Sequence, residues 1–143
     1  MYGKSQSRVN YDIVRRGDIM SLLGNILWIF LGGGIFLFFE YLIGGLLLCL
    51  TIIGIPFGLQ CIKLSILGLV PFGKEIVTTE SANGCLSVLM NIIWILVGGI
   101  WIAVTHFIFA LLMAITIIGI PFAKQHIKFA SLALMPFGRE IRG

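Results

Sequence analysis

The chain repeats itself, and this internal duplication constrains the fold more than any other feature of the sequence. The heptapeptide Thr-Ile-Ile-Gly-Ile-Pro-Phe occupies residues 51–57 and returns unchanged at 116–122. Upstream, Asn-Ile-Leu-Trp at 25–28 is matched by Asn-Ile-Ile-Trp at 91–94. Downstream, both copies end in Pro-Phe-Gly followed by a basic residue and Glu. Matches in this order along most of the chain indicate two copies of one structural unit.

The composition indicates that each unit is embedded in a membrane. Only 11% of the 143 residues are charged and 59% are hydrophobic, whereas a soluble domain has about 25% charged residues. Each copy contains two apolar stretches, at 19–39 and 41–57 in the first copy and at 85–105 and 107–122 in the second. A helix of about 20 apolar residues can cross the hydrocarbon core. We therefore expect an all-α integral membrane protein with four transmembrane helices, arranged as two tandem helical hairpins in parallel repeat.

Each hairpin is followed by a stretch that mixes apolar and basic residues. This pattern is typical of a short amphipathic helix in the headgroup region, with Lys63 of the first copy reaching outward. The alternative is that the second span continues through a proline kink. The sequence divides into a basic N-terminal tail (1–18), a first hairpin repeat (19–76), a linker (77–84) and a second hairpin repeat (85–143).

The basic residues predict the orientation in the membrane. With these spans, every lysine and arginine falls on one side, and the two expected hairpin tips carry none. By the positive-inside rule, both termini and the central linker are then cytoplasmic. The two copies point the same way, about a pseudo-twofold axis along the membrane normal. The basic side chains suit anionic lipid headgroups as partners, and not nucleic acid. They are Lys4, Arg8, Arg15, Arg16, Lys63, Lys74, Lys124, Lys128, Arg139 and Arg142.

Three motifs, each present twice and in the same order, carry a resemblance to a known family. They are Asn-x-x-Trp-x-x-x-Gly-Gly, Gly-Ile-Pro, and Pro-Phe-Gly followed by Lys or Arg and then Glu. The chain resembles the YccF family, also called the inner membrane component domain, over residues 22–141. The resemblance implies a multi-pass protein of the bacterial inner membrane. The family it resembles has no established activity, so no catalytic residue is carried over.

Polar side chains within the apolar stretches are the first candidates for function. Asn25 and Asn91 lie near the cytoplasmic ends of the first spans, where an amide needs a hydrogen-bond partner that lipid does not supply. They either join helices within one chain or line a pore in an oligomer. Thr51 and Thr116 either bond carbonyls of the preceding turn or face the same pore. The full set of possible pore or polar-contact residues is Asn25, Asn91, Thr51, Thr116, Gln60 and Gln125.

Glycine and proline predict a break in the second helix of each copy. The break residues are Gly54 and Pro56, with Gly119 and Pro121 in the second copy. A proline inside a helix has no N–H to donate and clashes with the carbonyl four residues before it, which frees that carbonyl. The break either swings the chain into the interfacial helix or exposes carbonyls to an ion path.

Glu40 and His106 separate the two spans of their copies. Both residues either mark solvated outer turns or meet across the pseudo-twofold axis. In the second case they form a proton-sensitive outer gate, since histidine titrates near neutral pH.

Two functions remain open from the sequence. The first is a homo-oligomeric ion or small-solute channel, because four short spans leave little room for a pore within one chain. The second is a membrane scaffold or accessory subunit that transports nothing. We expect neither an enzyme nor a cofactor or metal site, because the sequence contains no catalytic triad, nucleotide loop or metal-ligand cluster.

Overall fold

The computed structural model describes residues 2–143, and the protein is mostly helical. The first repeat contains α1 (Tyr2–Leu31), α2 (Gly34–Cys49), α3 (Ile55–Leu69) and the short strand β1 (Glu75–Thr78). A 3₁₀ turn, η1 (Glu80–Asn83), links it to the second repeat. The second repeat contains α4 (Cys85–Trp94), a π-helical turn η2 (Ile95–Gly99), α5 (Ile100–Ala114), α6 (Ile120–Leu134) and the strand β2 (Arg139–Arg142).

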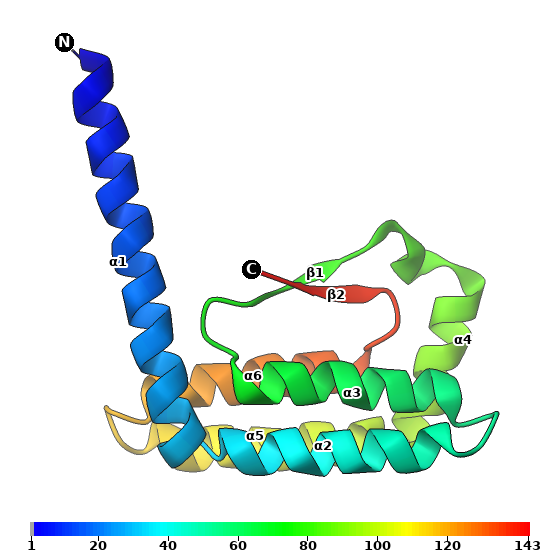
Figure 1. Cartoon of the computed structure of the whole chain (residues 1–143). Helices are drawn as coiled ribbons and strands as arrows, with labels where there is room; N and C mark the ends of the chain where they lie inside the picture. Colours follow the sequence, from blue (N-terminus) through cyan, green and yellow to red (C-terminus); the bar gives the residue numbers. More distant parts are fainter. Residues whose placement is uncertain (1) are drawn as a thin grey trace.

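The helices form a slab of two layers, from which two further helices project (Figure 1). Helices α2 and α5 make one layer, α3 and α6 make the other, and each hairpin packs antiparallel on itself. Helices α1 and α4 rise from opposite ends of the slab toward the same side. The ribbon β1–β2 covers α3 and α6 on that side. We call the surface that carries β1 and β2 the ribbon face.

The two repeats are related by a local twofold axis through the ribbon. Strands β1 and β2 are antiparallel, and Ile76 lies opposite Ile141, which is its own copy. On either side of this pair, Glu75 lies opposite Arg142, and its copy Glu140 lies opposite Val77. Such a register arises only when the axis passes through the central pair. The duplication found in the sequence is therefore a twofold arrangement in space.

The first helix of each copy bends before it reaches the predicted hairpin tip. In the first copy α1 ends at Leu31, and α2 sets off at 75° to it. Gly33 makes this bend in the left-handed conformation, with φ 76°, which a glycine adopts without strain. In the second copy the change of direction occurs at the π-helical turn η2. The predicted span 19–39 is therefore two helices and not one.

The bend also locates a one-residue offset between the repeats. Gly34 lies against the Trp28 indole, and Gly99 lies in the same way against Trp94. Gly34 and not Gly33 is therefore the counterpart of Gly99, and the first copy has one extra residue at its bend. This moves every later equivalence by one position. The counterpart of His106 is Tyr41, and not Glu40 as predicted.

Helices α2 and α3 are separate, so the chain does not continue as one rod through Pro56. The turn at 50–54 joins them, and Pro56 lies in the first turn of α3, where no N–H is needed for a helical hydrogen bond. Pro121 has the same place at the start of α6. This differs from the predicted kink within a helix, because the chain has already turned before the proline is reached.

Apolar side chains cover much of the outside of the slab. The interior holds two tryptophans, Trp28 and Trp94, packed with aromatic and leucine side chains of α3 and α6. Within residues 2–143, one continuous helix, Cys85–Ala114, is long and apolar enough to cross a membrane. The bent pair Asp12–Leu31 and Gly34–Cys49 passes the same test only when both helices are taken together. Four separate crossings are not evident from helix length.

Candidate functional site

Each repeat uses its asparagine to fix its own Pro-Phe-Gly turn. Asn25 Nδ2 donates to the Phe72 carbonyl at 3.1 Å, and the Phe72 N–H donates to Asn25 Oδ1 at 2.8 Å. Asn91 makes the same two bonds with Phe137, both at 3.0 Å. Both ends of each amide are engaged in these bonds. We call this pair of bonds the asparagine clamp.

The tryptophans add a second attachment one turn further along the same helices. The Trp28 indole N–H donates to the Gly68 carbonyl at 2.7 Å, and Trp94 donates to the Ala133 carbonyl at 2.6 Å. Trp28 is fully buried and Trp94 nearly so. Both side chains are packing residues in the core. The clamp and the indole together attach the first helix of each repeat to the end of its third.

Two lysines exchange contacts between the repeats. Lys63 of α3 donates to the carbonyls of Pro136 and Arg139, at 2.6 and 2.9 Å. Lys128 of α6 donates in return to the carbonyls of Pro71 and Lys74, at 2.9 and 2.7 Å. We call these contacts the lysine exchange. The prediction that Lys63 reaches outward is wrong, since its ammonium binds the turn of the other repeat.

Burial changes the proton affinity of both exchange lysines. It lowers the pKa of Lys63 to about 8, partly offset by the nearby Glu140 carboxylate. It also lowers the pKa of Lys128, against the opposing effect of Glu75. Neither lysine was a candidate residue in the sequence. The only available signal was that a lysine recurs at the same place in both copies.

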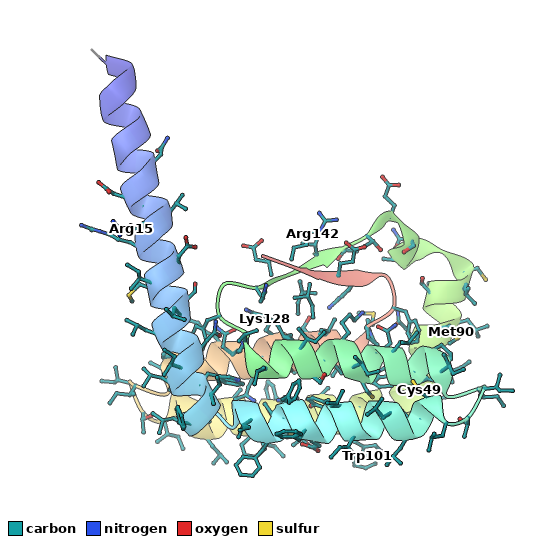
Figure 2. The ribbon with its side chains drawn as sticks, viewed as in Figure 1. Arg15, Cys49, Met90, Trp101, Lys128 and Arg142 are labelled. Atoms are coloured by element: carbon teal, nitrogen blue, oxygen red, sulfur yellow. The ribbon has the colours of Figure 1, made fainter. Side chains whose placement is uncertain are left out.

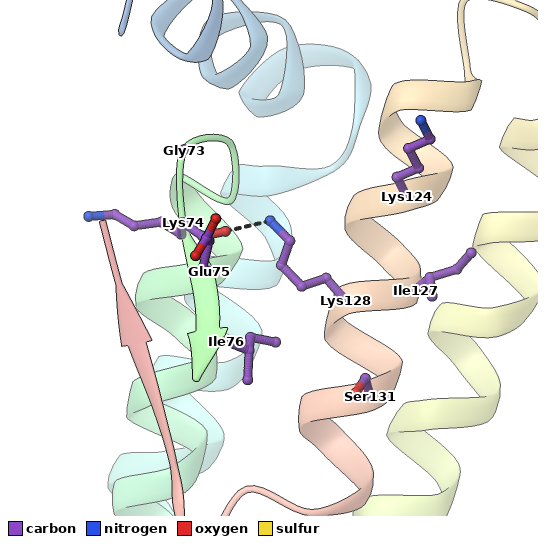
Figure 3. A pocket seen from close by; sticks show the side chains of 8 residues that line it. All are labelled: Gly73, Lys74, Glu75, Ile76, Lys124, Ile127, Lys128 and Ser131. Atoms are coloured by element: carbon purple, nitrogen blue, oxygen red, sulfur yellow. Dashed lines mark hydrogen bonds between the residues drawn. The ribbon is translucent and has the colours of Figure 1, made fainter. Parts of the chain in front are cut away.

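A cavity of about 690 Å³ opens between β1 and α6 on the ribbon face (Figure 3). Lys128 reaches across it toward β1, Lys124 lies one turn earlier on α6, and Ser131 lies one turn later. Lys74 points its ammonium away, toward the end of β2. A smaller cavity of about 340 Å³ lies at the twofold-related place beside Lys63. This smaller cavity is lined by Lys63, Ile66, Lys74, Glu140 and Ile141.

The threonines build the turns at the two ends of the slab. The Thr51 hydroxyl donates to the Leu48 carbonyl at 3.0 Å, as predicted, and accepts from the Gly54 N–H at 3.0 Å. Thr116 makes the same pair of bonds with Met113 and Gly119. The hydroxyls are thus engaged inside their own turns, about one slab length away from the asparagine clamps of the same repeat (Figure 1).

The outer surfaces of these turns are strongly apolar. Ile52 is 88% exposed and Ile117 is 87% exposed, and their neighbours Ile53 and Ile118 are similar. The two turns point away from each other, at opposite ends of the slab (Figure 1). Neither turn presents a charged side chain.

A buried polar cluster lies where the two hairpins meet. The Tyr41 hydroxyl contacts His106 Nε2 across the twofold axis. His106 Nδ1 lies 2.9 Å from Nδ1 of His126 on α6. All three side chains are buried. Sequence reasoning missed His126 and Tyr41, and the alignment offset by one residue is the reason Tyr41 was overlooked.

Of the two residues predicted as an outer gate, His106 belongs to this cluster and Glu40 does not. Glu40 and His106 both lie inside helices, α2 and α5, and neither marks a hairpin tip. Glu40 is exposed and His106 is buried. The Oε1 atoms of Gln60 and Gln125 are buried without a hydrogen-bond partner in the described part of the chain.

Comparison with known proteins places this sequence in a family. Residues 23–74 and 89–139 each match the family described as YccF, the inner membrane component domain. The inner membrane protein YccF of Escherichia coli strain K12 is 28% identical over 120 residues, covering 78% of this chain and 81% of that protein. The protein of the same name from Shigella flexneri matches equally well. No solved structure matches. The family is described by its membrane location and not by an enzymatic activity. The two matched segments cover most of the chain and coincide with the two structural repeats, so the chain belongs to the YccF family of inner membrane component domains.

Proposed function

We propose that the protein is a structural component of the inner membrane that transports nothing, and that its slab lies in the plane of one leaflet. The observation that carries this proposal is the apolar surface at both ends of the slab. Ile52 and Ile117 are almost fully exposed at opposite ends. If the slab helices ran along the membrane normal, both ends would still lie in hydrocarbon, but the lysines of the ribbon face would lie beside acyl chains. Lying in the plane, both ends remain in hydrocarbon while these lysines reach the headgroups.

Helix length supports the same placement. Helices α2, α3, α5 and α6 have 15 or 16 residues. At 1.5 Å per residue each is about 23 Å long, which is short of the roughly 30 Å of the hydrocarbon core. Two helix layers of about 10 Å each make a slab about 20 Å thick. A body of that thickness fills one leaflet and displaces acyl chains there more than in the other leaflet.

The distribution of charge orients the slab. The lysines of α3 and α6 and the charged ends of β1 and β2 gather on the ribbon face (Figure 2). Helices α2 and α5 present Phe36, Phe39, Trp101 and their neighbours on the other layer. We place the ribbon face at the cytoplasmic headgroups, where anionic lipids attract Lys and Arg. Both termini then lie on the cytoplasmic side.

The engagement of the polar side chains favours a scaffold over a channel. A pore through an oligomer requires asparagine and threonine groups that face a common water-filled space. Here the asparagine clamps use both ends of each amide, and the threonine hydroxyls both donate and accept within their turns. Opening a pore at these residues would require breaking bonds to the partly buried backbone groups of Phe72 and Phe137.

Cysteine labelling tests the in-plane placement. In a variant without native cysteines, we would introduce Glu40→Cys, Thr105→Cys and, as a control, Ser81→Cys, and add a membrane-impermeant maleimide to each side in turn. Ser81 is exposed in the linker and should react from the cytoplasmic side only. Positions 40 and 105 lie in helices of the slab and should react from neither side. Reaction of position 40 from the periplasm would mean that the hairpins cross the membrane, as the sequence alone predicted.

Ion flux tests the absence of transport. Purified protein in liposomes should release no more potassium, sodium or chloride than empty liposomes do. A flux above that of empty liposomes would instead establish a channel, and its loss in Asn25→Leu and Asn91→Leu variants that circular dichroism shows to be folded would place the asparagines in its lining.

A further inference from the structure

We propose that the protein binds a neutral, lipid-soluble molecule through a carbonyl oxygen, in an apolar cavity that ends at His126. The cavity has a volume of about 350 Å³ and lies beside the bend at Gly33, between the two hairpins. Apolar residues of both repeats line it, among them Phe36, Phe109 and Met113, and its polar side chains are His126 and Glu40. This volume is at the lower end of the range for small-molecule sites.

His126 is the feature that points to a ligand. The side chain is 2% exposed, and its Nε2 atom has no hydrogen-bond partner in the part of the chain that the structure describes. A buried polar nitrogen without a partner costs about 1–3 kcal/mol. The other ring nitrogen is engaged with His106, so the ring is held in place. The free nitrogen belongs to a residue that lines the cavity.

The hydrogen-bond chain determines which kind of partner is missing. We assign the Tyr41 phenol as the donor to His106 Nε2, because the described part of the chain offers its hydrogen no other acceptor. Neutral His106 then carries its proton on Nδ1 and donates to His126 Nδ1. Neutral His126 must therefore carry its own proton on Nε2. The cavity ends in an N–H donor, and a ligand must supply an acceptor.

The surroundings select among acceptors. The cavity wall is mostly apolar, so the ligand must have an apolar body and must reach the site through lipid. Glu40 lies at the same cavity, and its carboxylate disfavours an anionic ligand such as a fatty acid. A neutral carbonyl satisfies both conditions. Lipid-soluble molecules that present one include benzoquinones with an alkyl tail and the ester groups of diacylglycerols.

The histidine at this cavity belongs to the second repeat and has no counterpart in the first, which supplies matched substitutions. Residue 61 is Cys where the second repeat has His126, and residue 48 is Leu where it has Met113. His126→Cys therefore installs a side chain that the same fold already buries at the equivalent position. Met113→Phe fills the cavity, and Leu48→Phe makes a comparable change away from it.

Binding to purified protein in nanodiscs of zwitterionic lipid tests the proposal. The probes are a decyl-substituted benzoquinone, dioctanoylglycerol, and a decylbenzene that lacks the carbonyl. The Trp28 ring lies beside His126, tilted against it with ring centroids 4.9 Å apart, so its fluorescence reports occupancy. At least one carbonyl probe should bind, and decylbenzene should bind about tenfold more weakly, which corresponds to one hydrogen bond. The tighter carbonyl probe identifies the natural source as quinone or lipid ester.

The variants separate the proposed contact from general apolar binding. His126→Cys should weaken the carbonyl probe about tenfold and leave decylbenzene unchanged. Met113→Phe should abolish binding of all probes, and Leu48→Phe should change none. In ¹⁵N-histidine spectra, the Nε2 resonance of His126 should shift when the carbonyl probe is added. Failure of both carbonyl probes to bind better than decylbenzene, or unchanged affinity in a folded His126→Cys or Met113→Phe variant, would overturn the proposal.

Discussion

The two repeats keep the same attachments and differ in what lies between them. Both have the asparagine clamp, the indole bond and the threonine turn, and each gives one lysine to the other. They differ at the bend, where the first copy uses an extra glycine and the second uses a π-helical turn. They also differ in the core, where the first repeat has Tyr41 and Cys61 at the positions that His106 and His126 occupy in the second.

This contrast distinguishes the contacts that hold both repeats together from the features that are present in one repeat only. Attachments that occur twice bind backbone groups and hold helices to turns. The differences lie at the bend and among buried side chains of the core. Twofold copies in one chain therefore serve as controls for each other, since the same substitution can be made in the same local structure.

The largest effect is expected from breaking an asparagine clamp. Asn25→Leu leaves the N–H and the carbonyl of Phe72 without partners, at a cost of about 3 kcal/mol. Asn91→Leu should cost the same amount, because its bonds to Phe137 have the same geometry. Thermal unfolding in detergent, followed by circular dichroism, measures both. A large loss for only one of the two variants would show that the clamps are not equivalent.

The lysine exchange should give a slightly smaller effect with a characteristic pH dependence. Lys63→Met leaves the carbonyls of Pro136 and Arg139 without this donor and should cost about 2 kcal/mol. The folded pKa of Lys63 is about 8, below its ordinary value of 10.5. Between these values the unfolded chain binds more protons than the folded chain, so stability rises with pH.

Unfolding measured from pH 7.5 to 10.5 in wild type and in Lys63→Met checks this pH dependence. The rise in wild type should be smaller in the variant, which no longer carries the shifted group. An equal rise in both proteins would assign the pH dependence to other residues.

The bend should respond differently in the two repeats. Gly33→Ala places a Cβ on a residue with φ 76° and should cost about 1.5 kcal/mol. Gly98 lies in the helical turn of the second copy, and a Cβ there meets no atom within 4 Å. Gly98→Ala should therefore be neutral or slightly stabilising. Melting temperatures of the two variants, measured side by side, decide the matter, and equal losses would contradict the assigned difference in backbone conformation.

The smallest effect is expected for headgroup binding at the ribbon face. Lys124 on α6 corresponds to Leu59 on α3, so Lys124→Leu copies the first repeat into the second. A single lysine near an anionic surface contributes about 1 kcal/mol, which is about a fivefold change in affinity. Binding of fluorescent phosphatidylglycerol to the detergent-solubilised protein should weaken by that factor. Leu59→Lys should strengthen it, and no change in either variant would exclude this face as a headgroup contact.

The sequence by itself determined the duplication, the helical class, the membrane location and the family. These follow from local patterns, because hydrophobic runs and repeated motifs are visible without knowing which residues meet. The bond of Thr51 to the preceding turn was also predictable, since its partner Leu48 lies three residues away in the sequence. The position of the bend in the first copy was predicted only roughly. Residues 32–34 are three consecutive glycines, and no sequence pattern shows which of them is the extra residue.

Only the tertiary structure decided the pairing of Tyr41 with His106, the exchange of Lys63 and Lys128 between repeats, and the free nitrogen of His126. Each of these depends on contacts between residues distant in sequence, and an error of one position in the alignment moves a side chain to a different face of its helix. The direction of the hairpins was undetermined for a related reason. Hydropathy is the same for an apolar hairpin that crosses a bilayer and for one that lies in a leaflet, whereas the true ends of the helices and the 75° bend at Gly33 are visible only in three dimensions.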